Sequence, residues 1–359
     1  MNVLGIETSC DECSASVVAD GETILSNIIA TQIPFHAPWN GVVPEIASRK
    51  HVEWIYRVTK EALDGAGLDV NGIDAVAVTN RPGLAGSLLV GLSFAKAFAW
   101  SRNIPFIALD HMLAHLYAPM LPPQGKNTAA DNNLTSTAEK PEYPFLGLLV
   151  SGGHTIICRA DNFDDISVLG TTIDDAAGEA FDKIAKHYNF GYPGGLVIDK
   201  MARNGDDKAF RFPMPSLHKG DHRYDVSYSG LKNAAINQLD IFNKKDNYTN
   251  EDIAASFQKT AVEILLRALF NALEDTGLTT IVAGGGVAAN SLLRSRLESK
   301  LFSINQDKKY RCFFPPLELC GDNAAMVAGL GYQYIKRGEC SPLNATVSAR
   351  VTGFKKKYP

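Results

Sequence analysis

The sequence predicts an α/β protein with a duplicated core, in which helices pack on two mixed β-sheets. Each of two parts of the chain begins with three consecutive strand-like runs, after which helical patterns alternate with single strands. Consecutive strands pair antiparallel, whereas strands joined through a helix run parallel, so each sheet is expected to be mixed. The length of 359 residues suffices for two domains, at roughly 100–200 residues per domain.

The first part of the chain has the order β-β-β-α-β-α-β-α. Polar turns at Thr8–Glu12 and Asp20-Gly21 separate the first three apolar runs. Pro44 opens a helix in which apolar residues recur at helical spacing, and Gly65 ends it. The predicted strands are 3–6, 13–19, 23–30, 74–79 and 104–109, and the predicted helices are 44–65, 84–100 and 111–120.

A stretch rich in Pro, Asn, Thr, Ala and Ser, residues 122–143, follows and shows no apolar periodicity, which predicts a long surface loop near a domain boundary. The three-strand pattern then returns, without detectable identity to the first part. The predicted strands are 145–150, 154–159, 166–171, 279–283 and 311–314, and the predicted helices are 177–188, 198–204, 229–240, 251–275, 288–300 and 322–337.

The composition excludes several classes of protein. Lys and Arg number 35 and Asp and Glu 39, so the net charge is −4 and the chain is not a generally basic nucleic-acid coat. Hydrophobic residues make up 45% and charged residues 21%, which is typical of a globular chain. No apolar run reaches the ~18 residues of a membrane-spanning helix. The N-terminus lacks a signal-peptide pattern and six Cys are too few for a disulfide scaffold, so we expect a cytoplasmic protein without a membrane partner.

Three turns have the composition of anion-binding loops. They are Glu7-Thr8-Ser9-Cys10-Asp11-Glu12, Ser151-Gly152-Gly153-His154-Thr155 and Gly284-Gly285-Gly286-Val287-Ala288-Ala289-Asn290. Small residues let a ligand approach backbone N–H groups, and a helix that starts after Gly286 would add a favourable dipole. None of them matches a Walker P-loop or a G-x-G-x-x-G motif, and ordinary turns share this composition. The combination of three such loops favours phosphate binding.

His111 and His115 are spaced i and i+4 directly after a predicted strand, which places both on one face of a helix. Two surface or capping histidines would have the same spacing. A metal needs a third ligand, and Asp322, which begins a helix after Gly321, would complete a set of two His and one carboxylate that suits Fe(II) or Zn(II). Spacing alone does not select Asp322. Met112 follows His111 where HExxH metalloproteases carry their Glu base.

Weaker signals have simpler explanations. Cys10-x-x-Cys13 lies between two strands and lacks a second Cys pair, so we interpret it as coincidence. The segment Pro44–His51 is either a solvated helix or a contact surface for a partner or the active-site rim. Residues 200–232 carry a local charge of +3 among aromatic side chains, which suits nucleic acid but is also common on ordinary surfaces.

Taken together, the motifs resemble the TsaD/Gcp family, the tRNA adenosine threonylcarbamoyltransferases, from residue 1 to about residue 334. The segments that carry the resemblance are GIETSCDE at 5–12, PEIASRKH at 44–51, His111-x3-His115, LVSGGHT at 149–155, DDAAGEAFDK at 174–183, YPGG at 192–195, SYSGLK at 227–232, residues 284–290 and Gly321-Asp322-Asn323. The motifs are long and occur in order, so chance similarity is not a serious alternative.

The resemblance implies an actin/Hsp70/sugar-kinase-like fold of two α/β lobes with a central cleft. On that fold, the N-terminal lobe is 1–121, completed by about 323–345, followed by a loop insertion at 122–144, a C-terminal lobe at 145–322 and a tail at 346–359. The implied reaction is an acyl transfer. Threonylcarbamoyl-AMP donates its threonylcarbamoyl group to the exocyclic amine of the adenosine next to the anticodon, in tRNAs that read ANN codons.

The resemblance also assigns residues. It implies that His111, His115 and Asp322 bind one divalent metal per subunit, usually iron, with Zn2+ as the alternative. It matches substrate-binding positions to Leu149, Val150, Ser151, Gly152, Gly153, Asp182, Gly195, Asp199 and Asn290. The loops supply Ser9, His154, Gly284, Gly285 and Gly286 as support for the nucleotide. The implied bacterial partners, besides tRNA, are a TsaB-like paralogue and a TsaE-like P-loop ATPase.

The chemistry of the donor agrees with these residues. Threonylcarbamoyl-AMP is a mixed anhydride and is already activated, so no covalent enzyme nucleophile is needed. A metal and well-placed donors for the developing oxyanion suffice. Glu12 or Asp11 is the candidate to orient the attacking amine or take its proton.

The sequence departs from the family pattern at four places. Cys13 stands where the family usually has Thr, Asn40 stands where Gly is common before Gly41, and Arg81 stands where Gly commonly precedes Pro82. Leu149 occupies the place of a metal-reaching Tyr in the archaeal and eukaryotic branch, which favours a bacterial chain.

Three other functions remain alternatives. An ATPase or small-molecule kinase of the same fold would share the phosphate loops but has no use for the paired histidines. A metalloprotease would need a base where Met112 stands. A non-catalytic scaffold would bind nucleotide and partners, but the scaffold paralogue of the family lacks the metal histidines.

Overall fold

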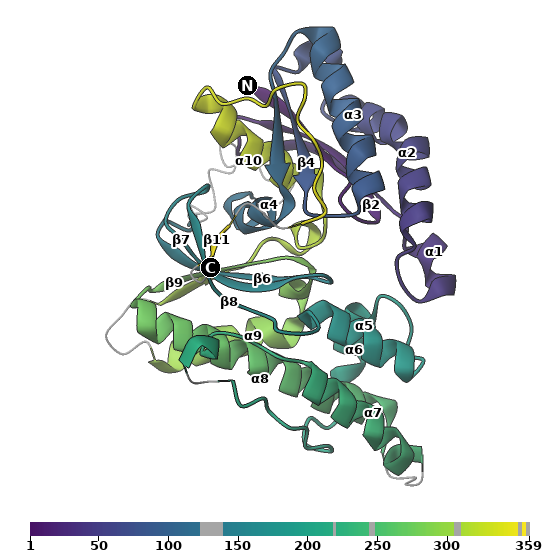
Figure 1. Ribbon diagram of the computed structural model, residues 1–359, viewed down its shortest axis with the longest axis vertical. Helices are drawn as coiled ribbons and strands as arrows, with labels where there is room; N and C mark the ends of the chain where they lie inside the picture. Colours follow the sequence, from purple (N-terminus) through teal and green to yellow (C-terminus); the bar gives the residue numbers. More distant parts are fainter. Residues whose placement is uncertain (123–138, 218–219, 244–247, 305–309, 351–353, 357–359) are drawn as a thin grey trace, which may run out of the picture. The chain divides into compact units, whose positions relative to one another are not determined.

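The computed structural model describes residues 1–122, 139–217, 220–243, 248–304, 310–350 and 354–356. The chain divides into two compact units, each with its own β-sheet (Figure 1). The first comprises Met1–Pro141 and Pro315–Phe354, and the second comprises Glu142–Phe314 and Lys355–Pro359. The first unit therefore includes Asp322, which the sequence prediction assigned to the C-terminal lobe.

Five strands form the sheet of the first unit: β1 (Asn2–Glu7), β2 (Glu12–Ala19), β3 (Thr23–Thr31), β4 (Ala75–Arg81) and β5 (Phe106–Asp110). Their order is β3-β2-β1-β4-β5. β1 pairs antiparallel with β2 and parallel with β4, so the sheet is mixed, as the sequence predicts. The turn between β1 and β2 carries Ser9, Cys10 and Asp11 at the end of the central strand.

The helices of the first unit are α1 (Ile33–His36), α2 (Pro44–Gly65), α3 (Ala85–Arg102), α4 (His111–Tyr117) and α10 (Ala324–Lys336). Leu4 and Ile6 of β1 pack in one core with Ile55 of α2 and side chains of α3. Gly5 faces the opposite side, where a Cβ would lie 2.2 Å from the carbonyl oxygen of Ala324. Glycine at this position lets α10 lie directly against the sheet, which is covered on both faces (Figure 1).

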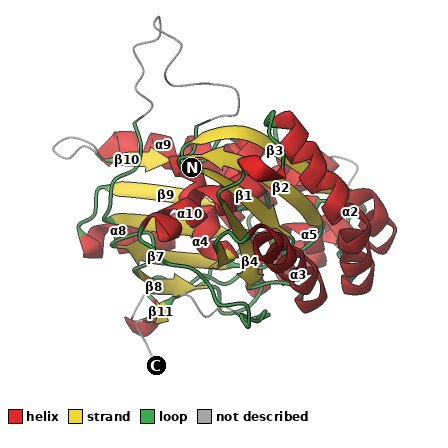
Figure 2. Cartoon of the chain, turned by 90° about the horizontal axis from the view of Figure 1, so that it is seen from above, coloured by secondary structure: helices red, strands yellow, loops and turns green. Residues whose placement is uncertain are grey.

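The second unit repeats this plan with β6 (Phe145–Val150), β7 (Thr155–Ala160), β8 (Ile166–Thr171), β9 (Thr280–Gly284), β10 (Arg311–Phe313) and β11 (Lys355–Lys356). The order is β10-β9-β6-β7-β8-β11, and Figure 2 shows β7, β8 and β11 side by side in this sheet. β6 is antiparallel to β7 and parallel to β9, which matches the arrangement around β1. The duplicated core is confirmed.

The helices of the second unit are α5 (Ala177–His187), α6 (Gly194–Ala202), α7 (Ser229–Asn243), α8 (Asn250–Thr276) and α9 (Ser291–Ile304). α8 is the central helix of this core, and its Phe257 ring packs edge-on against Phe181 of α5 at 5.3 Å. Thr249 and Asp252 form a reciprocal capping box that starts α8.

Several predicted boundaries are wrong. α6 begins at Gly194 rather than residue 198, because the Asp182 carboxylate accepts a hydrogen bond from the Gly194 N–H. A 3-10 helix, η5 (Gly286–Ala289), follows the third glycine loop and α9 starts only at Ser291, so no α-helix begins directly after Gly286. The predicted tail pairs in part with β8, as β11. Residues 123–138 of the predicted loop lie outside the described part of the chain.

Candidate active site

Two histidines stand on α4, which begins at the end of β5. Asp110 caps this helix, because its Oδ1 accepts a hydrogen bond of 2.9 Å from the Met112 N–H. His111 and His115 follow one turn apart and are 7% and 0% exposed. Asp322 comes from the short segment before α10, and the Ala324 N–H holds this segment to β2 by donating to Ser14 Oγ at 2.9 Å.

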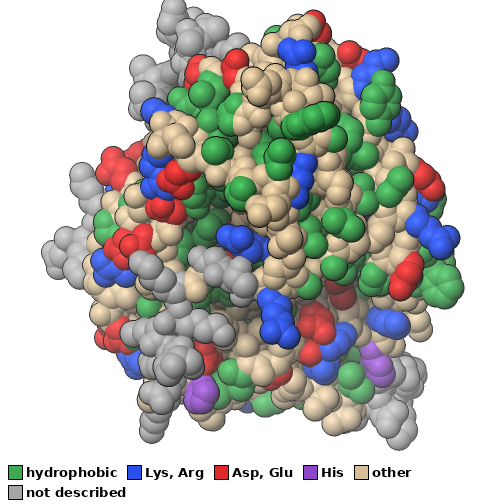
Figure 3. Space-filling view, turned by 45° about the horizontal axis from the view of Figure 1, so that its top comes forward, with side chains coloured by type: hydrophobic (Ala, Val, Ile, Leu, Met, Phe, Trp, Pro, Cys, Tyr) green, Lys and Arg blue, Asp and Glu red, His purple; other side chains and the backbone are tan. Residues whose placement is uncertain are grey.

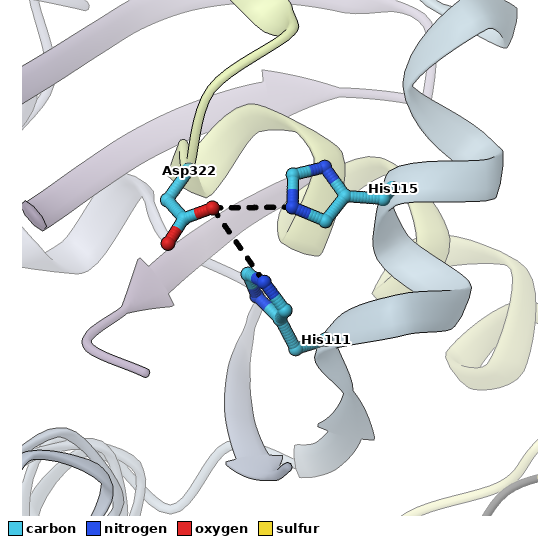
Figure 4. Close-up of side chains that lie close together, drawn as sticks. All are labelled: His111, His115 and Asp322. Atoms are coloured by element: carbon cyan, nitrogen blue, oxygen red, sulfur yellow. Dashed lines mark hydrogen bonds and ion pairs between the residues drawn. The ribbon is translucent and has the colours of Figure 1, made fainter. Parts of the chain in front are cut away.

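The structure brings these three side chains together (Figure 4). Asp322 Oδ1 lies 3.1 Å from His115 Nε2 and 3.5 Å from His111 Nε2. One ligand atom from each residue lies within 4.8 Å of the other two. Two imidazole nitrogens and a carboxylate oxygen that converge in this way fit a divalent transition metal.

A fourth residue, Glu7 at the end of β1, orients His111 from behind. Its Oε2 lies 3.0 Å from His111 Nδ1, and its Oε1 accepts a 2.6 Å hydrogen bond from the Ser9 N–H. Glu7 is fully buried. A carboxylate on Nδ1 keeps the proton there and leaves Nε2 free to bind a metal. From the sequence, Glu7 is only the first residue of the turn at 7–12, because a polar residue that ends a strand carries no signal of a contact with His111.

Electrostatics differ between the two histidines. Burial alone would lower the pKa of His111, but the carboxylates of Glu7 and Asp322 outweigh it and raise the pKa to about 9. Burial and the neighbouring His111 lower the pKa of His115. A metal that binds here would replace the Nε2 proton of the charged His111 ring and leave the Nδ1 proton in place.

The turn between β1 and β2 carries the two predicted catalytic carboxylates. Glu12 is the first residue of β2, and its Oε1 accepts a hydrogen bond of 3.0 Å from Thr31 Oγ1. Burial raises the pKa of Glu12 well above its usual range, and the charges of Asp11 and Asp322 add to the rise. Ser9, which the sequence predicts as support for the nucleotide, has its Oγ 3.2 Å from His111 Nδ1. All six cysteines are free, including Cys10 and Cys13.

A cavity of about 270 Å³ lies in the second unit. Five predicted substrate residues line it: Gly152, Asp182, Gly195, Asp199 and Asn290. A Cβ at Gly152, Gly195 or Gly286 would meet no atom within 4 Å, so these glycines border open space that a ligand can enter. Gly286 is the loop-support residue that also lines the cavity.

Other predicted residues of the second unit do not line this cavity. The side chains of Leu149 and Val150 are fully buried in β6. Ser151 and His154 close a tight turn, in which the His154 N–H donates to Ser151 Oγ at 3.2 Å and the Ser151 N–H to the His154 carbonyl at 2.8 Å. Gly153, Gly284 and Gly285 are also absent from the lining.

Gly285 packs closely against the end of β6. Its φ is +93°, in the region that favours glycine, and a Cβ would lie 2.4 Å from the carbonyl oxygen of Val150. Gly178, at the start of α5, is similarly tight against the Ser151 carbonyl, where a Cβ would approach to 2.7 Å. The loop after β9 therefore lies against the end of β6, and the start of α5 lies against the loop after β6.

One glutamine joins two of the residues that line the cavity. Gln258 Nε2 donates to Asp199 Oδ1 at 2.7 Å and to Asn290 Oδ1 at 3.1 Å. Asp199 Oδ1 also accepts from Ser291 Oγ, at 2.8 Å. Gln258 is 1% exposed and lies on α8 among apolar residues, so helical periodicity marks its position as core and does not reveal this contact.

The two sheets share one arrangement of strands and carry glycine loops at their strand ends, which defines an actin/Hsp70/sugar-kinase-like fold. This chain also carries a group of two His and one Asp. Solved structures agree with this fold. HypF from T. kodakarensis matches 94% of this chain and 48% of its own at a TM-score of 0.57, with 14% identity. Component A of the (R)-2-hydroxyglutaryl-CoA dehydratase of Acidaminococcus fermentans matches 94% of this chain and 100% of its own, with a TM-score of 0.53 and 14% identity.

The sequence relationships are much closer. Residues 23–329 match the model of the TsaD family, described as tRNA N6-adenosine threonylcarbamoyltransferase. A protein of that name from Treponema denticola is 62% identical over 358 residues, which is 99% of both chains. The protein of the same name from Borrelia garinii is 49% identical over 360 residues, which is 100% of this chain and 99% of the relative. The chain belongs to the TsaD family.

Proposed function

We propose that this chain is a tRNA N6-adenosine threonylcarbamoyltransferase that takes the threonylcarbamoyl group from threonylcarbamoyl-AMP. The acceptor is the exocyclic amine of the adenosine next to the anticodon in tRNAs that read ANN codons. Membership of the TsaD family and relatives of that name along the whole chain support the reaction. The convergence of two buried histidines, His111 and His115, with the partly exposed Asp322 is the structural observation that carries the proposal.

The metal site of this proposal consists of His111 Nε2, His115 Nε2 and the Asp322 carboxylate, with Fe2+ as the ion expected in the family and Zn2+ as the alternative. A divalent ion bound there supplies Lewis-acid polarisation of a substrate oxygen. Glu7 fixes the tautomer of His111 through Nδ1. Met112 is buried between the histidines and has no basic group, which argues against a protease.

The cavity of the second unit is the proposed place for the AMP half of the donor. Its glycines leave room for a phosphate near backbone N–H groups, and these groups stabilise negative charge. Asp199 and Asn290 offer polar side chains at the wall, held in place by Gln258. An ATPase of the same fold would also bind nucleotide in this cavity, but its reaction does not require the His–His–Asp group.

The transfer needs one proton acceptor. The adenosine nitrogen forms a bond with the carbamoyl carbon, the bond from that carbon to the phosphate oxygen breaks, and AMP leaves with the electron pair. The nitrogen loses a proton, and we propose Glu12 as its acceptor, with Asp11 as the neighbouring carboxylate. The raised pKa of Glu12 makes it a better base than a solvated carboxylate.

The remaining partners are part of the same proposal. With a net charge of −4, the chain lacks the general excess of cations that binds a polyanion, and the face drawn in Figure 3 shows acidic and basic side chains interspersed. We therefore propose that tRNA binds a composite surface made with a TsaB-like paralogue and a TsaE-like ATPase, in the cytoplasm. In the described part of the chain, no helix has the length and apolar character to cross a membrane.

A reconstituted assay tests the function. Purified chain and its partner proteins receive threonylcarbamoyl-AMP and unmodified tRNA, and the nucleosides are analysed by mass. We expect modified adenosine with the wild type and at least a hundredfold less, on the order expected for loss of a metal site, with His111→Ala/His115→Ala. A folded, metal-loaded wild type that gives no product would contradict the transferase and favour the ATPase or the scaffold.

A further inference from the structure

The turn between β1 and β2 is held by its carbonyl groups. Three consecutive carbonyl oxygens each accept a hydrogen bond from a different segment. The Leu84 N–H at the start of α3 donates to Ser9 O at 2.8 Å, and the Gln32 N–H before α1 donates to Asp11 O at 3.0 Å. The middle carbonyl, that of Cys10, lies 2.9 Å from Nε2 of His51, a side chain of α2. Of these three ties, the one at Cys10 depends on a side chain and can therefore be removed by substitution.

The burial and protonation of His51 suit this contact with the Cys10 carbonyl. It is fully buried on α2, and burial lowers its pKa, so the ring is neutral at pH 7. Because a carbonyl can only accept, the ring proton must be on Nε2, which leaves Nδ1 as an acceptor. Nδ1 is buried and has no hydrogen-bond partner among the described residues. Such an unpaired atom costs stability, and hydrophobic side chains would pack there without that cost.

The Cys10 peptide lies between the two parts of the proposed chemistry. On one side, Ser9 Oγ reaches His111 Nδ1 at 3.2 Å. On the other side, the chain continues directly into the carboxylates of Asp11 and Glu12. The peptide orientation at Cys10 thus sets how these carboxylates are presented relative to the histidine.

We propose that His51 is a positioning residue for the transfer reaction, which fixes the Cys10 peptide through Nε2 and so aligns Asp11 and Glu12. This inference rests on the proposed function. In the described structure His51 itself makes no hydrogen bond or ion pair with the three proposed metal ligands, and it acts through the turn. The sequence predicts the segment Pro44–His51 as either a solvated helix or a contact surface. Its last residue, His51, is buried and contacts the Cys10 carbonyl of the turn.

Two amide substitutions test the position of the donor. In His51→Gln the side-chain N–H is at the same distance along the chain as Nε2, whereas in His51→Asn it corresponds to Nδ1. Both variants are polar and uncharged, and the asparagine side chain is one methylene shorter. We expect His51→Gln to keep most of the rate constant for transfer and His51→Asn to lose about 10- to 100-fold. Thr59→Val, on the buried face of the same helix and away from the turn, is the matched control and should leave the rate unchanged.

A double-mutant cycle separates positioning from a general structural effect. In a Glu12→Gln background, the loss caused by His51→Asn should largely disappear, because the group that His51 aligns is already absent. Metal content should be the same in His51→Asn and His51→Gln, and both variants should remain folded at the assay temperature, although the smaller asparagine is expected to lower the thermal midpoint. Equal rates for the two variants, or losses that multiply with Glu12→Gln, would overturn the role of His51. Failure of the wild type to make product would instead overturn the proposed function.

Discussion

Glu7 Oε2 lies 3.0 Å from His111 Nδ1, in a pocket where the carboxylate is fully buried. The contact spans 104 residues of sequence and joins the central strand of the first sheet to the helix that carries both histidines. The carboxylate accepts a hydrogen bond from the Nδ1–H group of His111, and Nε2 is directed at Asp322. Glu7 of this strand therefore determines which nitrogen of His111 is available to a metal.

Glu7→Gln should weaken metal binding by about 10- to 100-fold. A glutamine N–H facing Nδ1 favours the tautomer with the proton on Nε2, where it blocks the metal. Metal content after dialysis against a buffered series of free Zn2+ concentrations measures the effect. Glu22→Gln, at a carboxylate exposed on the surface of the same unit, is the control and should bind as the wild type does. Equal affinity in Glu7→Gln would show that the carboxylate does not set the tautomer.

Gln258→Leu should raise the KM for threonylcarbamoyl-AMP by about tenfold, the order of one lost positioning contact, while kcat changes little. The leucine has a similar volume but cannot donate to Asp199 and Asn290, so both side chains lose their alignment at the cavity wall. Thr260→Val on the same helix removes a hydroxyl that donates to the Ser256 carbonyl at 3.0 Å, and it is the matched control. A fall in kcat at unchanged KM would contradict a role in donor binding.

Neighbouring glycines of the third loop should respond differently to alanine. Gly285→Ala places a side chain at φ +93° and 2.4 Å from the Val150 carbonyl, so the free energy of unfolding should fall by about 1–3 kcal/mol. A Cβ at Gly286 meets no atom within 4 Å, so Gly286→Ala should keep its stability but narrow the cavity and weaken donor binding. Denaturant titration and equilibrium binding of AMP distinguish the two. Similar stability losses at both positions would refute this division of roles.

Asp175 should make part of the stability depend on pH. Burial opposes ionisation of this carboxyl, but Lys183 Nζ at 2.6 Å and Lys232 Nζ at 2.5 Å outweigh burial and lower its pKa. Because the folded chain prefers the charged form more than the unfolded chain does, the stabilisation is complete above the unfolded value of about 3.9 and is lost as pH falls through the lower folded value.

Asp175→Asn should therefore destabilise the protein at pH 7, and the difference from the wild type should shrink below about pH 4. Denaturant unfolding at a series of pH values measures it, and Lys232→Met should give a smaller change of the same sign. A difference that is constant over the whole range would mean that the carboxylate charge is not responsible.

The order of strands and helices was predictable because periodicity and turn residues are local. The duplicated meander and the helix that carries His111 and His115 follow from that pattern alone. The short α1 was not predictable, since a four-residue helix is too short to show a period. The start of α6 was not predictable either, because the Gly194-Gly195 pair is typical of a loop. At Gly194 a distant carboxylate, Asp182, decides the outcome.

The candidate site divides in the same way. The spacing of His111 and His115 is visible in the sequence, whereas Asp322 was selected by family resemblance, since 207 residues separate it from His115. Glu7, His51 and Gln258 are buried polar residues in otherwise apolar elements, and each is explained only by a contact with a distant segment. No local pattern distinguishes such residues from ordinary members of the core.

Metal dependence of the transfer tests the central claim most directly. The wild type and His111→Ala/His115→Ala are stripped with a chelator, supplied with Fe2+ or Zn2+, and given partner proteins, threonylcarbamoyl-AMP and tRNA. We predict that the stripped wild type makes no modified adenosine and regains activity with one equivalent of metal, while the variant stays inactive. Full activity of a wild-type protein shown to be free of metal would contradict the role assigned to His111, His115 and Asp322.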